Sequence, residues 1–381
     1  MAALETWLQL PSRQQDLQQQ AFATQPLSKS QAEQTRRLLI AEDARQTKAH
    51  HEEEWKKKQI TLGELNMKFD YTVFADKPAD GRSLFISMHG GGNTSKSIND
   101  QQWENQKKLY KPIEGVYLAP RAPNDAWNMW FQPHMDAFFS RLIQDAAVFE
   151  EVNVDKVYLM GYSAGGDGVF RMAPRMAHRW AAAAMMAGHP GDVRADNLRN
   201  LPFTLHMGEN DKAYDRNKQA LVWKKLLLDL REQDPHGYTH EVVIQPGMGH
   251  WMQRKDAIAI PWMMKFTRNT VPRKIVWVEP LQPSFYWLAQ AEFPADKLKA
   301  AKMVATVDQQ NISIESEHFN GITLRLRDDL INLDQPISIR WNGKLLPEKS
   351  IHRTISTQRK TLLEHHDKGL CFDAEVKVQA P

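Results

Sequence analysis

The chain has 381 residues, with 49 Lys plus Arg against 46 Asp plus Glu and a formal net charge of +3. This near balance, without a dominant basic block, argues against a nucleic-acid-binding protein. Cys371 is the single cysteine, which excludes an intrachain disulfide and a cysteine-based zinc site and favours a reducing, cytoplasmic location. No stretch approaches the roughly 18 apolar residues of a membrane-spanning helix, and the first residues lack the pattern of a signal peptide. We therefore expect a soluble protein, secreted only if a signal peptide has been removed.

Residues 1–63 are rich in Gln, Lys and Glu and favour helix. Leu38, Leu39 and Ile40 supply only a short apolar stripe within this polar stretch, so one face at most can be buried. We predict an N-terminal helical extension that docks on the protein surface.

Residues 64–271 alternate short apolar runs with helical stretches, a pattern typical of βαβ units and a mostly parallel sheet. Helices are expected at 134–152, 216–233 and 254–268. The expected strands are 67–74, 83–89, 115–120, 156–161, 181–188, 203–208 and 240–247.

Residues 272–381 change to alternating runs such as NISIES, GITLRLR and PISIRW. Asn342-Gly343 directly after the last of these is a strong hairpin signal. We predict a small C-terminal all-β module that packs on the rest of the chain, since no long linker precedes it.

The stretch VYLMGYSAGG, residues 157–166, has the pattern G-x-S-x-G around Ser163. The pattern alone is weak, but here a strand precedes it and a helix follows. Gly161 and Gly165 allow a sharp turn between the two elements, which exposes the serine above the sheet and points helix amides at it. Ser163 is the predicted nucleophile.

A serine that attacks a carbonyl also needs donors for the oxyanion. HGGG, residues 89–92, follows the expected strand at 83–89, and its glycines let backbone amides turn towards a site. We expect the amides of Gly90 or Gly91, with that of Ala164, to form the oxyanion hole.

The base and the acid are expected later in the chain, after later strands. His250 follows the last strand in the turn GMGH, and Asp211 follows the strand 203–208. The order Ser163, Asp211, His250 is therefore the predicted triad, with Asp192 and Asp215 as alternative acids.

With these motifs, residues 64–270 resemble the α/β-hydrolase superfamily, and are similar to bacterial poly(3-hydroxybutyrate) depolymerase-like and phospholipase/carboxylesterase proteins. The resemblance rests on HGGG, GYSAGG, GENDKAY and GMGH. It implies an α/β-hydrolase fold, a mostly parallel central sheet flanked by helices. GYSAGG with an Asp four residues after the serine is also similar to prolyl-oligopeptidase-like peptidases, although no propeller precedes it.

Aromatic residues are the candidates for the substrate pocket: Trp127 and Trp130 in a loop after the strand 115–120, Tyr162 beside the nucleophile and Trp251 beside the base. Capping of the core is the other interpretation of the Trp-rich loop. GGGNTSKS differs from a phosphate loop because Ser95 stands where the motif needs Gly, and the pairs His50-His51 and His365-His366 are expected to be solvated. No cofactor or metal is predicted.

The function predicted from the sequence is a serine carboxylic-ester hydrolase that forms an acyl-enzyme. Its partner is a small or oligomeric ester. The sequence is compatible with a homo-oligomer. A serine peptidase for short peptides and a non-catalytic binding scaffold are the alternatives. For the C-terminal module, targeting to a polymeric substrate is the alternative to simple packing.

Overall fold

The computed structural model describes residues 2–9, 17 and 20–381. The chain forms two compact units: a central unit, His50–Asn269, and a terminal unit made of Met1–Ala49 and Thr270–Pro381. The N-terminal residues thus group with the C-terminal residues, whereas the sequence suggested an extension of 63 residues, a catalytic domain and a separate C-terminal domain. The central unit is therefore inserted between the two segments of the terminal unit.

The central unit is built on one sheet of eight strands in the order β1-β2-β4-β3-β5-β6-β7-β8. From β4 to β8 the neighbours are parallel, while β1 and β2 are antiparallel additions at one end. The strands are β1 (Gln59–Leu62), β2 (Leu65–Phe74), β3 (Arg82–Met88), β4 (Gly115–Pro120), β5 (Val152–Tyr162), β6 (Ala182–Met186), β7 (Phe203–Gly208) and β8 (His240–Gln245).

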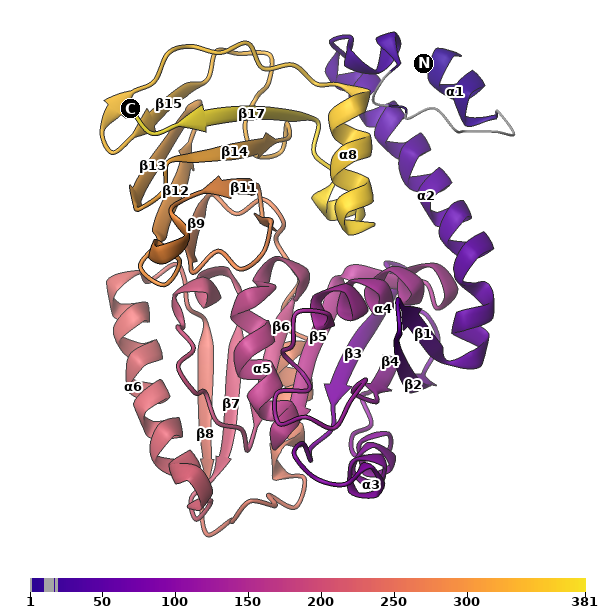
Figure 1. Ribbon diagram of the computed structural model, residues 1–381, viewed down its shortest axis with the longest axis vertical. Helices are drawn as coiled ribbons and strands as arrows, with labels where there is room; N and C mark the ends of the chain where they lie inside the picture. Colours follow the sequence, from indigo (N-terminus) through magenta and orange to yellow (C-terminus); the bar gives the residue numbers. More distant parts are fainter. Residues whose placement is uncertain (1, 10–16, 18–19) are drawn as a thin grey trace. The chain divides into compact units, whose positions relative to one another are not determined.

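Helices cover this sheet, and α6 lies alongside β8 at the end of the sheet (Figure 1). They are α3 (Lys96–Gln106), α4 (Met135–Phe149), α5 (Ala164–Arg175), α6 (Arg216–Gln233) and α7 (Ala259–Met263), together with the end of α2 (Lys29–Lys57). The helix expected at 254–268 is much shorter: a 3-10 turn at Lys255–Ile258 leads into α7. Pro261 lies inside α7, where its ring fits only the first turn of a helix. Further 3-10 turns are Ala177–Arg179, Asp196–Asn200 and Ala213–Asp215.

The strand order explains why the predicted site residues meet. Parallel neighbours end at the same edge of a sheet, and the loops after β3, β5, β7 and β8 carry the residues singled out in the sequence. The strands β4, β6 and β7 are buried at every position, as expected where helices cover both faces of a sheet. Phe85, Tyr158 and Met160, for example, belong to a core that continues to Met263 of α7. A rigid, buried sheet thus positions loops at one edge.

The terminal unit contains two sheets, with the orders β10-β11-β14-β17 and β16-β15-β13-β12-β9. Asn342 and Gly343 both have positive φ and connect β15 to β16, as the hairpin signal predicted. The strands are β9 (Lys274–Val278), β10 (Ser284–Phe285), β11 (Leu288–Glu292), β12 (Lys302–Asp308), β13 (Asn311–Glu317), β14 (Gly321–Leu326), β15 (Ser338–Trp341), β16 (Lys344–Leu345) and β17 (Ala374–Gln379).

In the N-terminal part of this unit, α1 (Ala2–Leu8), the 3-10 turn Ala21–Thr24 and residues 29–49 of α2 agree with the predicted helical extension. After residue 272 the structure also contains α8 (Ile355–His365) and 3-10 turns at Ala295–Lys297 and Lys368–Leu370, which the alternating pattern did not indicate. Thr354 begins α8 by accepting a hydrogen bond from the Thr357 amide, a standard N-cap. The C-terminal residues are therefore β-rich with one helix rather than all β.

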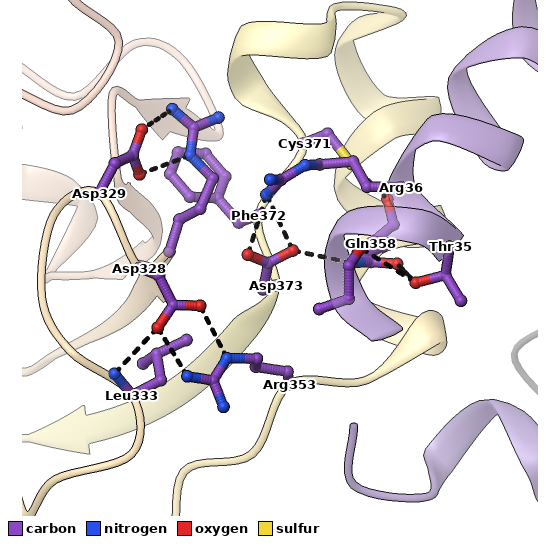
Figure 2. Close-up of polar contacts among 12 residues, drawn as sticks. Thr35, Arg36, Asp328, Asp329, Leu333, Arg353, Gln358, Cys371, Phe372 and Asp373 are labelled. Carbon is purple, nitrogen blue, oxygen red and sulfur yellow. Dashed lines mark hydrogen bonds and ion pairs between the residues drawn. The ribbon is translucent and has the colours of Figure 1, made fainter. Parts of the chain in front are cut away.

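A buried polar network joins α2 to the C-terminal segment (Figure 2). Both Asp373 oxygens accept from the Arg36 guanidinium, at 2.9 and 3.1 Å, and Gln358 donates to the same carboxylate. Thr35 in turn donates to the Gln358 oxygen at 2.6 Å. The buried face of α2 is thus partly polar, so its weak apolar stripe in the sequence did not reveal how deeply it is packed.

In the part of the chain that the structure describes, no helix has the length and apolar character needed to cross a bilayer.

Candidate active site

Ser163 lies between β5 and α5 with φ 58° and ψ −120°, a conformation that L-residues rarely adopt. Its amide donates to the Met186 carbonyl at 3.0 Å, and its carbonyl accepts from the Asp167 amide at 3.0 Å. Both bonds anchor the turn on its two sides, so the strained conformation is held by the sheet and the helix. The serine side chain is thereby placed at the edge of the sheet.

Two glycines make this turn sterically feasible. A Cβ on Gly161 would lie 2.3 Å from the Gly165 carbonyl oxygen, and one on Gly165 would lie 2.1 Å from the Met88 carbonyl oxygen. Real Cβ atoms do not approach backbone oxygens so closely, and these neighbours are main-chain atoms that cannot turn away. The two glycines of the motif are therefore required by the close approach of β3, β5 and α5.

His250 and Asp211 lie next to Ser163. His250 Nε2 is 2.9 Å from Ser163 Oγ, and His250 Nδ1 is 2.7 Å from Asp211 Oδ2. The Asp211 side chain is only 2% exposed. Because a carboxylate only accepts, the imidazole carries its proton on Nδ1 and offers Nε2 as the acceptor for the serine hydroxyl.

The alternative acids lie elsewhere. Asp192 pairs with Arg171 at 2.6 Å and its side chain is exposed. Asp215 pairs with Lys218 at 2.8 Å. Neither contacts His250, so the structure brings together Ser163, His250 and Asp211 from the loops after β5, β8 and β7.

The glycine loop after β3 is held by His89. His89 Nε2 accepts from the Ala122 amide at 3.2 Å, so Nδ1 carries the proton and donates to the Gly90 carbonyl at 2.6 Å. Burial lowers the pKa of His89 to about 3, which keeps the ring neutral. In a trans peptide the N–H points opposite to the C=O, so this bond fixes the direction of the Gly91 amide.

Other contacts complete this loop. Gly91 and Gly92 have φ of 100° and 78°, and the Gly92 amide donates to Asn99 Oδ1 at 2.8 Å. The amides of Gly91 and Ala164 have no acceptor among the described residues. Gly90 abuts the nucleophile, since a Cβ there would lie 3.2 Å from Ser163 Cβ. Donors without partners thus lie beside Ser163.

Tyr162 connects the strand that carries Ser163 to the loop that carries His250. Its hydroxyl donates to the His250 carbonyl at 2.6 Å and accepts from the Met252 amide at 2.9 Å. Burial raises the pKa of this hydroxyl, so it stays protonated and remains a donor. Its ring also lies near the rings of His250 and Trp251. Two residues of one loop are thereby fixed to the residue next to the serine.

Two cavities have Ser163 in their walls. The first, the His-side cavity, is about 560 Å³ in volume. It is lined by Gly90, Gly91, Gln102, Asn105, Gln106, Leu109, Tyr162, Ser163, His250 and Trp251. The second, the Arg-side cavity, is about 590 Å³ in volume. It is lined by Gly91, Gly92, Asn93, Trp127, Ser163, Ala164, Asp167, His189, Tyr214, Asp215 and Arg216.

Of the predicted pocket residues, Tyr162 and Trp251 line the His-side cavity and Trp127 lines the Arg-side cavity. Trp130 does not line either cavity, which corrects the sequence prediction. It is only 1% exposed, and its indole N–H donates to the His89 carbonyl at 2.9 Å. Trp130 therefore supports the glycine loop from behind.

Sequence reasoning missed Arg216 and gave Asp167 no role. The Arg216 side chain is 11% exposed, its Nη1 is 3.7 Å from Asp211 Oδ1, and its guanidinium lies over the Tyr214 ring. Asp167 accepts from the His189 amide at 2.6 Å, and burial raises its pKa. Arg216 lies two residues after the GENDKAY motif and Asp167 directly follows GYSAGG, so each lay near a recognised motif without a pattern of its own.

The remaining candidates have structural partners. Lys96 of the glycine-rich stretch pairs with Asp100. His51 Nδ1 is 2.6 Å from Asp145, and His366 Nδ1 is 2.8 Å from Asp43. Among the described residues no group of three or more His, Cys, Asp or Glu could hold a metal ion. The histidine pairs are therefore partly packed rather than simply solvated.

Comparison with known proteins bears on the fold and on the class of enzyme. Residues 114–264 match the model of the Dienelactone hydrolase family. None of the curated proteins matches the chain. Together with the sheet topology, the family match confirms the predicted α/β-hydrolase fold and supports a hydrolase that acts on ester bonds.

Solved structures similar to this chain are esterases and relatives. A thermostable esterase has a TM-score of 0.43 and 18% identity, over 55% of this chain and 62% of the esterase, so the chain covers less than two thirds of it. LpqC, a poly(3-hydroxybutyrate) depolymerase from Bordetella parapertussis, has a TM-score of 0.39 and 16% identity over 53% of this chain and 88% of that one. A carboxylesterase from Mesorhizobium loti has a TM-score of 0.37 and 19% identity over 54% of this chain and 98% of that one.

Proposed function

We propose that this α/β-hydrolase cleaves carboxylic esters through Ser163, His250 and Asp211 and an acyl-enzyme intermediate. The observation that carries the proposal is the chain of hydrogen bonds from Asp211 through His250 to Ser163, at 2.7 and 2.9 Å. His250 Nε2 takes the serine proton while Oγ attacks the ester carbonyl. Asp211 holds the imidazole in the required tautomer and stabilises its charged form.

The amides of Gly91 and Ala164, with Gly90 beside them, are the proposed donors to the oxyanion. Preorganised donors of this kind contribute about 3 kcal/mol of transition-state stabilisation each. Here His89 fixes the Gly90–Gly91 peptide before substrate arrives, because its Nδ1–H donates to the Gly90 carbonyl. No group from outside the protein takes part in any of these steps, apart from the ester and water.

The proposal is tested by intact-mass spectrometry after incubation with a fluorophosphonate. We expect a single covalent adduct on the wild-type protein and none on Ser163→Ala. Hydrolysis of p-nitrophenyl esters of graded acyl length should disappear in the same variant. Full activity of Ser163→Ala, or a wild-type protein that forms no adduct, would refute the assignment.

For the terminal unit we propose a structural role rather than targeting to a polymer. Aromatic residues, with a large apolar ring and in Tyr and Trp a polar group, dominate the energetics of binding surfaces. In this unit Trp7, Trp277, Trp287, Trp341 and Tyr286 are all buried. Variants that disturb this unit should aggregate or unfold before they lose activity on polymeric esters alone.

A further inference from the structure

The two cavities beside Ser163 differ in one respect that matters for chemistry. Both contain Ser163 and Gly91 in their walls, but His250 lines only the His-side cavity and Ala164 lines only the Arg-side cavity. An ester bound at Ser163 therefore has two different places for its two halves. The position of the group that transfers the proton decides which half of the ester lies in which cavity.

During acylation the Ser163 Oγ–carbon bond forms, the carbon–oxygen bond to the alcohol breaks, and the serine proton passes to His250 Nε2 and then to the leaving oxygen. The leaving oxygen must therefore face His250, while the carbonyl oxygen faces the Gly91 and Ala164 amides. In deacylation a water oxygen forms the new bond to the carbonyl carbon and passes its proton to His250, the bond between Ser163 Oγ and that carbon breaks, the carboxylic acid leaves, and His250 returns the proton to Oγ.

We propose that the alcohol half of the ester binds in the His-side cavity and the acyl half in the Arg-side cavity, and that the alcohol is polyhydroxylated and of sugar size. This inference rests on the proposed function, because it uses His250 as the general acid. It goes further by assigning each half of the substrate to its own residues.

The class of alcohol follows from the walls of the His-side cavity. Trp251 is 51% exposed, and its ring, tilted by 52° from that of the buried Tyr162, gives an apolar face in the wall of the cavity. The Gln102 side chain makes no hydrogen bond within the described part of the chain, and the Asn105 side chain uses only its oxygen, which accepts from Gln101. Carboxamides both donate and accept, so they match hydroxyl groups arranged around a ring that lies on Trp251.

Other polar groups near this cavity are already used. Gln106 donates to Ser87 at 2.7 Å. Tyr110, one residue after the lining residue Leu109, is buried and donates to the buried Asp256. Gln102 is therefore the side chain with the most free hydrogen-bonding capacity towards the alcohol.

The corresponding residue for the acyl half is Trp127, which is 64% exposed in the wall of the Arg-side cavity.

The test uses three acetates that share one acyl-enzyme: p-nitrophenyl acetate, a 6-O-acetyl methyl glucoside and cyclohexylmethyl acetate. Because the alcohol has left before deacylation, all three should converge on one deacylation rate. We expect the wild-type kcat/KM for the glucoside acetate to exceed that for the cyclohexylmethyl ester by about tenfold, as hydrogen bonds to the hydroxyls would give. Gln102→Leu should bring this ratio close to one and leave the deacylation rate within twofold of wild type.

Trp127→Ala should do the opposite. It should change the deacylation rate and the preference between p-nitrophenyl acetate and p-nitrophenyl phenylacetate, and keep the ratio between the two alcohols. Lys224→Ala, an exposed substitution on α6 that lines neither cavity, is the matched control and should change none of these quantities. The burst of p-nitrophenol measures the fraction of each variant that is folded and active.

Three results would overturn the inference. A wild-type ratio at or below one would exclude a polyhydroxylated alcohol. A Gln102→Leu variant that alters deacylation, or a Trp127→Ala variant that alters only the alcohol ratio, would mean that the halves are exchanged. Failure of the proposed function looks different, because it removes the burst and the Ser163 adduct from the wild-type protein.

Discussion

Removal of one oxygen atom from Tyr162 should reduce catalysis without touching any reacting group. Tyr162→Phe keeps the ring but loses the bonds to the His250 carbonyl, at 2.6 Å, and to the Met252 amide, at 2.9 Å. Each such bond contributes about 1 kcal/mol net, so their loss makes the productive position of the His250 loop about 2 kcal/mol less favourable. At 1.36 kcal/mol for each factor of ten, kcat/KM should fall about 30-fold.

The assay compares p-nitrophenyl butyrate with ethyl butyrate. A misplaced His250 should harm the ethyl ester more, because ethoxide needs a proton to leave and p-nitrophenoxide does not. KM should change little, since the ring still lines the cavity. Tyr238→Phe, which loses a buried hydroxyl that donates to the Asp196 carbonyl at 3.2 Å, is the control for lost stability alone. A loss below twofold, or an equal loss in Tyr238→Phe, would refute the reasoning.

Three further outcomes are expected. Gly165→Ala places a Cβ 2.1 Å from the Met88 carbonyl oxygen, so titration with a fluorophosphonate should find almost no reactive serine. Burial lowers the pKa of His206 to about 4, below its unfolded value near 6.5. The contribution of this neutral residue to the free energy of unfolding is therefore fully present above pH 6.5 and is lost as the pH falls towards 4. Denaturant unfolding at pH 7.5 and 4.5 should differ by up to about 3 kcal/mol from this residue, and His206→Gln should flatten the difference. Asp373→Asn leaves the Arg36 charge without its buried partner, which should destabilise the terminal unit by about 3 kcal/mol, as measured by urea unfolding, while ester hydrolysis persists.

The parts of the site that the sequence predicted are those that short motifs or a position directly after a strand describe. Gly161, Ser163 and Gly165 are adjacent and sterically coupled, so the pattern itself describes the turn. His250 and Asp211 follow strands whose parallel order brings their ends to one edge. The β4 strand and α6 were predicted to the residue for a related reason: apolar runs and helix formers without a competing turn signal.

The other parts depend on packing between distant segments. The sequence does not distinguish Trp127 from Trp130, which lie three residues apart, yet one lines a cavity and the other is buried against His89. The partner of α2 was hidden because its buried face uses Thr35 and Asp43 as well as apolar residues. Arg216 is five residues from Asp211 but gives no signal of its own, and the local fold turns its guanidinium towards that carboxylate.

The insertion of the central unit also has a consequence for how the protein is made. Residues 1–49 cannot complete their unit until Thr270–Pro381 have been synthesised, since Arg36 must find Asp373. At about 5–20 residues per second, the N-terminal part of α2 waits on the order of ten seconds or more while the central unit emerges and folds. During that time its partly polar inner face limits the apolar surface that it offers to other chains on the ribosome. The polar character that obscured this helix in the sequence thus suits a segment that must stay soluble before its partner exists.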